Sequence, residues 1–308
     1  MNSEENLFSS PPRERSICPF FRNPCIINSN NPVEKFFKIK VEFFSKKDFT
    51  EEMILMAVPP DCVGCVEFDP TVIPIMIVQL IIAPIVIVMS TDLIIKAYKR
   101  KKLATTTLMA TYVINAGIVL TPLISNLQCF FSGYCLPSYQ WVEVITFVLM
   151  SLLPMFFFTC CKELFLKNTP KWIFALYLIW GVVGLVLVLL PQNNWFVTGG
   201  DQTFRQITQT DVAAYMAVTF IIAFRGSFHA ASRMEKSAER TALRLIGIGA
   251  IGGIIGLVYA AIGVFVADIF GKNNIFLTLE WVCTFIALLS FYLGFSPPGW
   301  FKRRFEKE

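Results

Sequence analysis

Seven long apolar stretches constrain this chain more than any other feature. Each can cross a hydrocarbon core of about 30 Å, which takes roughly 20 residues of helix. Backbone groups cannot stay unpaired in lipid, and the stretches lack the alternation of barrel strands, so helices are predicted and a β-barrel is excluded. We predict spans at 72–95, 103–124, 141–161, 172–190, 211–231, 245–268 and 275–295.

The composition agrees with a membrane protein. Hydrophobic residues make up 55% of the chain and charged residues 16%, and the apolar residues arrive in blocks. The predicted fold class is therefore an all-α bundle of seven transmembrane helices, a multi-pass protein of the cell membrane whose first partner is the lipid bilayer. We divide the chain into a polar, loosely ordered segment 1–71, the helical domain 72–296 and a basic tail 297–308.

Lys and Arg cluster in alternate loops. They occur in "KAYKRKK" after the first span, "CKELFLKNTPK" after the third, "SRMEKSAER" after the fifth, and at Lys302, Arg303 and Arg304 in the tail. The positive-inside rule places these segments in the cytoplasm. We therefore expect a cytoplasmic C-terminus and, with seven spans, an N-terminus outside. The first residues do not resemble a secretory signal, so the first span is expected to act as the insertion signal.

Six of the nine cysteines fall on the predicted outer side. An even set in an oxidising compartment favours disulfides over a metal knuckle or redox pair at "CVGC", because no second CxxC or nearby His accompanies it. Adjacent Cys160 and Cys161 end the third span, where they can be lipidated or simply packed. No metal site is predicted. The first disulfide candidates are Cys62 with Cys65 and Cys129 with Cys135, and the remaining outer cysteines are Cys18 and Cys25.

The sixth span contains the glycine-rich run "GIGAIGG" at 247–253. It matches a GxGxxG pattern, but a dinucleotide site needs a preceding strand, and this run lies inside an apolar span. The GxxxG spacing instead predicts close helix packing, through Gly249 with Gly253 and Gly252 with Gly256. Pro84 and Pro154 lie inside the first and third spans and predict kinks there.

Ionisable residues within the spans are functional candidates, because each costs roughly 2.5 to 3.5 kcal/mol at mid-helix. Arg225 and His229 lie four residues apart on one face of the fifth span, and Asp92 at a similar depth is a candidate partner for Arg225. The alternative is that the arginine snorkels to the headgroups. We keep these three residues as a candidate intramembrane charge cluster.

A second polar set lies in the predicted outer half and consists of Gln79, Glu143, Asp268 and Glu280, with Asn115 near mid-depth. We take Gln79, Asn115, Glu143 and Glu280 as candidate ligand-binding residues. We expect an outward-opening pocket for a small-molecule ligand between the second, third and seventh spans. The alternative for the two glutamates is the interfacial belt, since each neighbours a tryptophan.

Catalysis finds little support in the sequence. The chain has one His and neither an HExxH nor a GxSxG motif, so no nucleophile and base can be assembled. The seventh span has no Lys for a retinal Schiff base. We expect no enzyme activity, no cofactor and, without a basic tract interleaved with aromatics, no nucleic-acid partner.

The chain closes on "FYLGFSPPGWFKRR" at 291–304. This run resembles the end of the seven-helix input region of bacterial and archaeal sensor proteins, which leads into PAS, GAF or histidine kinase domains. The resemblance implies an input module, here without those output domains, and makes Pro297, Pro298 and Trp300 a candidate transmission joint to a separate signalling partner in the cytoplasm. It transfers no ligand residues.

Three functional readings follow from the sequence. The first is an orphan sensor or receptor-like protein that transmits a signal to a separate partner. The alternative is a small transporter or channel of seven-helix type, which should show a repeat between the first and last three helices and a polar through-route. The third possibility is a structural membrane subunit. This interpretation would leave the ionisable residues within the spans without a function.

Overall fold

The computed structural model of the chain describes residues 66–136, 139–166, 169–193, 203–235, 238–266 and 275–297. All of them belong to one compact unit, 57–308. Seven of its helices are long and apolar enough to cross a membrane. The all-helical, multi-pass membrane architecture predicted from the sequence is therefore confirmed.

The helices extend beyond the apolar runs that predict them. A helix needs no change in backbone geometry where its side chains become polar, so hydropathy finds the part in the hydrocarbon and misses the helix ends. Helix α6 begins eight residues before the predicted start at 211. The seven helices are α2 (Ile73–Arg100), α3 (Leu103–Ser132), α4 (Tyr139–Phe165), α5 (Lys171–Leu189), α6 (Thr203–Ser232), α7 (Ala238–Phe265) and α9 (Ile275–Phe295).

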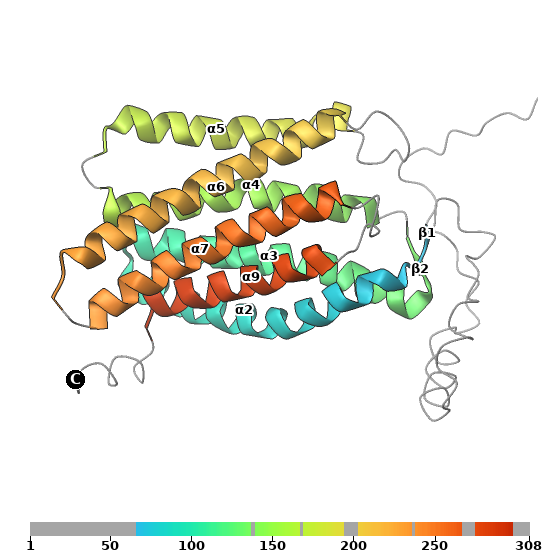
Figure 1. The fold of residues 1–308 in the computed structure, drawn as a ribbon, viewed down its shortest axis with the longest axis horizontal. Coiled ribbons are helices and arrows are strands. Elements are labelled where there is room, and N and C mark those ends of the chain that lie inside the picture. The colour runs from blue at the N-terminus through green and yellow to red at the C-terminus, as the bar shows by residue number, and fades with distance from the viewer. Residues whose placement is uncertain are drawn as a thin grey trace, which may run out of the picture. The chain divides into compact units, whose positions relative to one another are not determined.

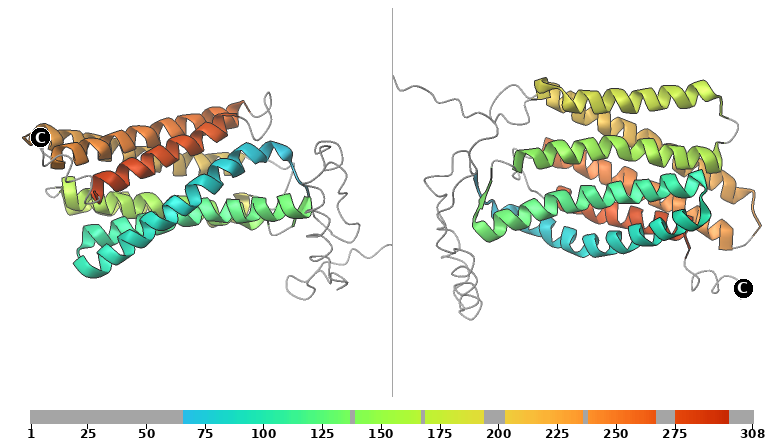
Figure 2. Two further views of the ribbon diagram at one scale, coloured as in Figure 1. Left: turned by 90° about the horizontal axis from the view of Figure 1, so that it is seen from below. Right: turned by 180° about the vertical axis from the view of Figure 1, so that it is seen from behind.

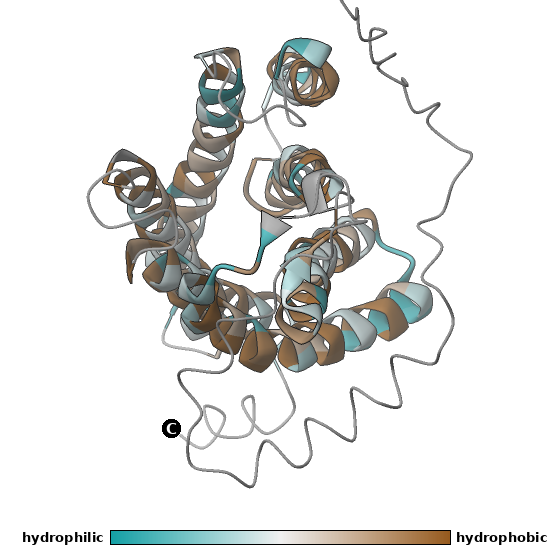
Figure 3. Ribbon diagram, turned by 90° about the vertical axis from the view of Figure 1, so that its right-hand side faces the viewer, coloured by the Kyte–Doolittle hydropathy of each residue, from teal (hydrophilic) through white to brown (hydrophobic). Residues whose placement is uncertain are grey.

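Six helices form a ring and the seventh lies against its outside. Neighbours around the ring are α2, α3, α4, α6, α7 and α9, and α9 packs back against α2. Helix α5 packs against α4 and α6 and runs along one edge of the bundle (Figures 1 and 2). Figure 3, which looks along the helices, shows hydrophobic residues over much of their length and hydrophilic residues at several helix ends.

The centre of the ring is filled by aromatic side chains. Phe157 of α4 contacts Phe291 of α9, with ring centroids 4.8 Å apart, and Phe220 of α6 at 6.2 Å. Phe220 and Phe291 also stack on each other, 6.1 Å apart. All three are buried. Edge-to-face and stacked ring pairs each add about 0.5 to 1.5 kcal/mol beyond their buried area, so this cluster holds helices from opposite sides of the ring together.

Glycines let α7 approach its two neighbours closely. Gly249, Gly252 and Gly256 lie against α9, where a Cβ on Gly249 would be 3.0 Å from the carbonyl oxygen of Ala287. Gly253 instead faces α6, because a Cβ there would be 2.7 Å from the ring of Phe220. The four glycines of the predicted packing motif thus belong to two interfaces of α7. Adjacent Gly252 and Gly253 point in different directions around the helix, so one faces α9 and the other faces α6.

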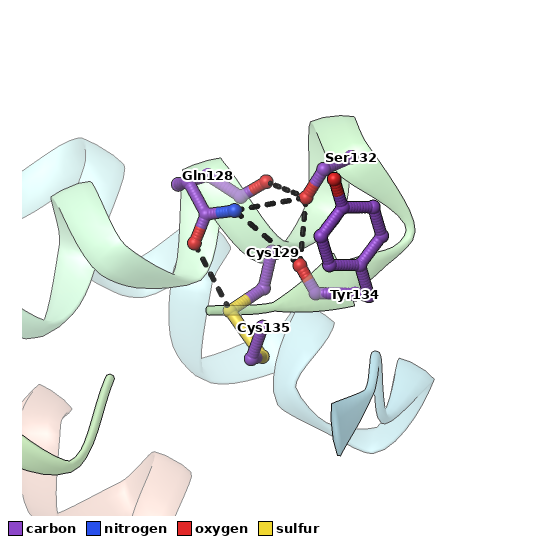
Figure 4. Close-up of a disulfide and its surroundings, with 5 residues drawn as sticks. All are labelled: Gln128, Cys129, Ser132, Tyr134 and Cys135. Carbon is purple, nitrogen blue, oxygen red and sulfur yellow. Dashed lines mark hydrogen bonds between the residues drawn. A yellow bond between two sulfur atoms is a disulfide. The ribbon is translucent and has the colours of Figure 1, made fainter. Parts of the chain in front are cut away.

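A disulfide closes one end of α3. Cys129 and Cys135 are bonded, with their Cα atoms 4.5 Å apart, and this is one of the two pairs predicted from the spacing. Gly133 between them has φ 79°, a left-handed conformation that ends the helix. Figure 4 shows Gln128 Nε2 donating to Ser132 Oγ, 2.9 Å away, beside the bond. Cys18, Cys25, Cys62 and Cys65 lie outside the described residues.

The disulfide also positions a short strand pair. β2 (Tyr134–Cys135) pairs antiparallel with β1 (Val66–Glu67), so that Val66 lies opposite Cys135. Below, "the disulfide end" means the end of the bundle that carries β1, β2 and this bond. "The basic end" means the opposite end, where α2 finishes at Lys99 and Arg100.

The contact between α9 and α7 generates a stability prediction. A Cβ on Gly294 would lie 2.5 Å from Ile246 Cγ1 and 2.7 Å from the carbonyl oxygen of Ala242, whereas a Cβ on Gly256 would meet α9 at 3.5 Å, an ordinary contact. We expect Gly294→Ala to destabilise the purified protein by about 1 to 3 kcal/mol, the usual cost of overpacking. The matched control Gly256→Ala should unfold at the wild-type temperature. Equal thermal unfolding of the two variants would contradict this packing.

Candidate functional site

The length of the shortest transmembrane helix allows the depth of its residues in the membrane to be estimated. Helix α5 has 19 residues, which at 1.5 Å per residue is about 28 Å, just the thickness of the hydrocarbon core. Its sequence from Trp172 to Leu189 contains no charged residue. Trp180 is the middle residue of α5, and we therefore expect it near the middle of the bilayer.

Asp211 of α6 lies at that same depth. The indole Nε1 of Trp180 donates a hydrogen bond to Asp211 Oδ1, 2.9 Å away. The second carboxyl oxygen, Oδ2, is enclosed by protein and accepts no hydrogen bond. It faces Gly184 of α5, where a Cβ would lie 3.1 Å from it. An acidic side chain at mid-membrane depth with an oxygen that lacks a partner is a strong indication of function.

Two tyrosine rings lie next to the Trp180 indole that binds this carboxyl group. Tyr215 of α6 lies 5.2 Å from the Trp180 ring and 4.5 Å from Tyr177 of α5, measured between ring centroids. The Tyr177 hydroxyl contacts Thr219 Oγ1 and also donates to the carbonyl oxygen of Tyr215 at 3.2 Å. We call Trp180, Tyr177, Asp211, Tyr215 and Thr219 the α5–α6 seam. It joins the peripheral helix to the ring through polar contacts inside the membrane.

Sequence reasoning placed Asp211 at the start of a span and so did not select it. The polar residues before it hide the fact that α6 begins at Thr203. A signal was nevertheless present, because Thr208, Asp211, Tyr215 and Thr219 recur at intervals of three and four residues. That spacing puts polar side chains on one helix face, which in a membrane span predicts a contact with another helix.

A second polar group joins α2 to α9 at the basic end. Lys96 Nζ lies 2.5 Å from Asp92 Oδ2, and it donates to Ser296 Oγ at 2.6 Å. The Tyr292 hydroxyl donates to Asp92 Oδ2 at 2.8 Å. We call these four residues the α2–α9 clamp. It lies directly before Pro297, so it fixes the end of α9 at the predicted transmission joint. Pro298 and Trp300 lie outside the described residues.

Tyr112 extends this connection to α3. Its hydroxyl donates to the carbonyl oxygen of Leu288 in α9, 2.6 Å away, and Ser90 of α2 donates to the carbonyl oxygen of Tyr112 at 3.0 Å. Tyr112 is 1% exposed. Three helices therefore share one buried polar junction next to the clamp, and the closing sequence around Tyr292 is built into the packing of the bundle.

The structure corrects the predicted pairing of Asp92 with Arg225. Asp92 binds Lys96 and Tyr292, and α2 is not a neighbour of α6 in the ring. Arg225 and His229 are exposed on α6, and none of the ion pairs in the described part of the chain involves them. In the described part of the chain these two residues therefore form no ion pair with Asp92, and snorkelling of Arg225 to the headgroups stays a prediction.

The predicted ligand residues point to different partners. Glu143 forms an ion pair with Arg205 of α6, and Asn115 Nδ2 donates to the carbonyl oxygen of Thr111 in its own helix at 3.1 Å. Gln79 is 1% exposed, with its Oε1 enclosed and unbonded. Glu280 lies on α9 beside α7. The described contacts of Gln79, Asn115, Glu143 and Glu280 thus lead to different parts of the bundle and do not indicate a common site for them.

The adjacent cysteines of α4 are part of the core. Cys160 is 1% exposed and Cys161 is fully buried, which is the packing alternative and leaves neither thiol accessible for a lipid chain. Among the described residues, no group of three or more His, Cys, Asp or Glu side chains is arranged to hold a metal ion.

In comparisons with protein family models, curated proteins and solved structures, nothing was found to match this chain. The resemblance of the closing sequence to sensor input regions therefore stays a prediction. The function has to be inferred from the α2–α9 clamp and the α5–α6 seam themselves.

The α2–α9 clamp generates a prediction about stability. In Asp92→Asn, the Lys96 ammonium loses its counter-charge and Tyr292 loses a charged acceptor, so we expect the variant to unfold about 1 to 2 kcal/mol more easily. The matched control is Glu163→Gln, which removes a pair with the adjacent Lys162 and should cost less than about 1 kcal/mol. Unfolding in detergent with increasing denaturant measures both. An Asp92 variant as stable as the control would mean that the clamp contributes nothing to holding α9.

Proposed function

We propose that this protein is a sensor or receptor-like membrane protein that passes a movement of α9 to a separate partner at the basic end. The observation that carries this proposal is the α2–α9 clamp, because Asp92 and Lys96 of α2 bond to Tyr292 in the last turn of α9 and to Ser296 just after it, directly before Pro297. The Lys and Arg asymmetry of the loops supports a cytoplasmic position for this end.

The contacts of the clamp suit a transmitting element. Asp92 and Lys96 keep 33% and 28% of their side-chain surface exposed, and hydrogen bonds in such a setting contribute only about 0.5 to 1.5 kcal/mol each. A clamp of this strength holds one position of α9 yet can open when another contact in the bundle changes. On its other side α9 is seated tightly on α7 through Gly294. A shift of α7 therefore has to move α9 and strain the clamp.

The channel or transporter reading is less well supported. A through-route along the ring would pass its centre, which Phe157, Phe220 and Phe291 occupy. A carrier was expected to show an internal repeat, and the order of the helices around the ring does not indicate one. Any six helices that each pack on the next helix in the chain give the same pattern of neighbours. No described contact favours a carrier, and we therefore retain the sensor reading.

The proposal is tested at the tail of the full-length protein in its native membrane. A photo-crosslinking amino acid at residue 305 reports which proteins lie beside the tail. We expect wild type to give a defined crosslinked partner and Asp92→Asn to change its yield at least several-fold, because the opened clamp releases the end of α9.

The control is again Glu163→Gln, which leaves the α2–α9 clamp intact and should give the wild-type yield. A tail that crosslinks only to lipid in every variant, or a partner whose yield is the same in wild type and Asp92→Asn, would overturn the proposal. Substrate uptake by vesicles containing the purified protein would support the carrier instead.

A further inference from the structure

We propose that Arg225 of α6 and Arg244 of α7 together bind the headgroup of an anionic phospholipid at the basic end of the bundle. Helices α6 and α7 are neighbours in the ring, and the chain turns between them after Ser232 (Figure 1). The site shares no residue with the α2–α9 clamp. It therefore goes beyond the proposed sensor function and does not depend on it.

Basic side chains gather on the exposed faces of these two helices. Arg225 and His229 are one turn apart on α6, so they share a face, and both are exposed. Arg244 is exposed on the second turn of α7. None of the ion pairs in the described ranges involves Arg225, His229 or Arg244. Three cationic or titratable side chains are thus presented to the surroundings of the bundle.

The acids of this stretch are too few to balance the bases. Residues 225–244 contain five Lys or Arg residues and two acids, Glu235 and Glu239, so the stretch has a positive net charge. Both glutamates are exposed, and neither belongs to a described ion pair. The surface therefore complements an anion.

A contact between the helices brings the two arginines to one surface. The ring of Phe228 on α6 lies against Gly247 of α7, where a side chain would overlap it. Arg225 precedes Phe228 by three residues, and Arg244 precedes Gly247 by three residues. Because the helices run in opposite directions, the two Cα atoms differ by about 9 Å along the helix axes, six residues at about 1.5 Å each. Two extended arginine side chains span that separation, so both can contact one phosphate beside Phe228.

Exposed apolar side chains next to the arginines identify the partner as a lipid. Ile221, one turn before Arg225, is 51% exposed, and Ile248, one turn after Arg244, is 46% exposed. Both isoleucines lie on the side of the arginines that faces away from the basic end, where acyl chains would run. A guanidinium group binds phosphate oxygens in pairs, and basic sites between transmembrane helices suit anionic headgroups. A free phosphate or an acidic protein would leave the apolar part of this surface uncovered.

Native mass spectrometry of the full-length protein in detergent tests the site, because it counts bound lipids one at a time. The probes are dioleoyl phosphatidylglycerol and, with the same acyl chains and no net charge, dioleoyl phosphatidylcholine. We expect wild type to bind its first phosphatidylglycerol more tightly than phosphatidylcholine. Arg225→Gln combined with Arg244→Gln should weaken the binding of phosphatidylglycerol about tenfold or more, because the charge-assisted hydrogen bonds to its phosphate are lost.

The matched control is Lys99→Gln combined with Arg100→Gln. It removes two exposed basic side chains from α2 at the same end of the bundle, and it should leave the affinity for phosphatidylglycerol nearly unchanged. Each single variant, Arg225→Gln or Arg244→Gln, should weaken the binding of the same one lipid. An equal loss of affinity in the two double variants would overturn the proposal, since it would reduce the effect to general attraction by positive charge.

Thermal unfolding separates lipid binding from folding and from binding of free phosphate. Because both arginines are exposed, the Arg225 and Arg244 double variant should unfold at the wild-type temperature without added lipid. Phosphatidylglycerol should raise the unfolding temperature of wild type and of the control but not that of this double variant. Inorganic phosphate should raise none of them. Stabilisation of wild type by inorganic phosphate as large as that by phosphatidylglycerol would overturn the assignment to a lipid.

Discussion

A polar side chain inside a bilayer has no water to bind, so its partners must come from the protein, and this constraint organises the bundle. It explains why serine and threonine hydroxyls bond back to carbonyls in their own helices, as Thr111 does to Thr107, and why the longer polar groups reach across to other helices. The Tyr112 hydroxyl joins α3 to α9, Trp180 joins α5 to α6, and Lys96 joins α2 to α9. These three helix pairs therefore have a polar contact that helps to set their register.

Close packing then allows these contacts to form. Hydroxyl and carboxyl groups bond only within about 3 Å, and the glycines of α7 bring that helix to the backbone of α9, so that α9 presents Tyr292 and Ser296 to α2 on its other side. Aromatic rings fill the centre that the ring of helices would otherwise leave open. The peripheral α5 has no place in the ring and depends on the α5–α6 seam. The bundle thus combines close glycine contacts with polar contacts between helices.

The sequence predicted the number and class of helices because hydrocarbon thickness acts on each span separately. It also predicted the Cys129–Cys135 pair, which is local in the chain. Contacts between distant helices were not predictable in the same way. Asp92 and Arg225 were predicted at a similar depth but belong to helices that are not neighbours in the ring, and that depends on the order of helices around the ring. Asp211 was missed because hydropathy marks the apolar part of α6 and not its start. The i, i+3 and i+4 pattern of polar residues on α6 was the one signal that pointed to it.

We infer that polar contacts between α2 and α9 hold the end of α9 in one position. Electron–electron distance measurements between nitroxide labels on Lys99 of α2 and Leu289 of α9 test this most directly, since both side chains are exposed. The protein should give a single narrow distance distribution in nanodiscs, and Tyr292→Phe, which removes one hydroxyl from the clamp, should add a second, displaced population. A distribution that is unchanged by Tyr292→Phe, or one that is already broad in the wild-type protein, would contradict the account.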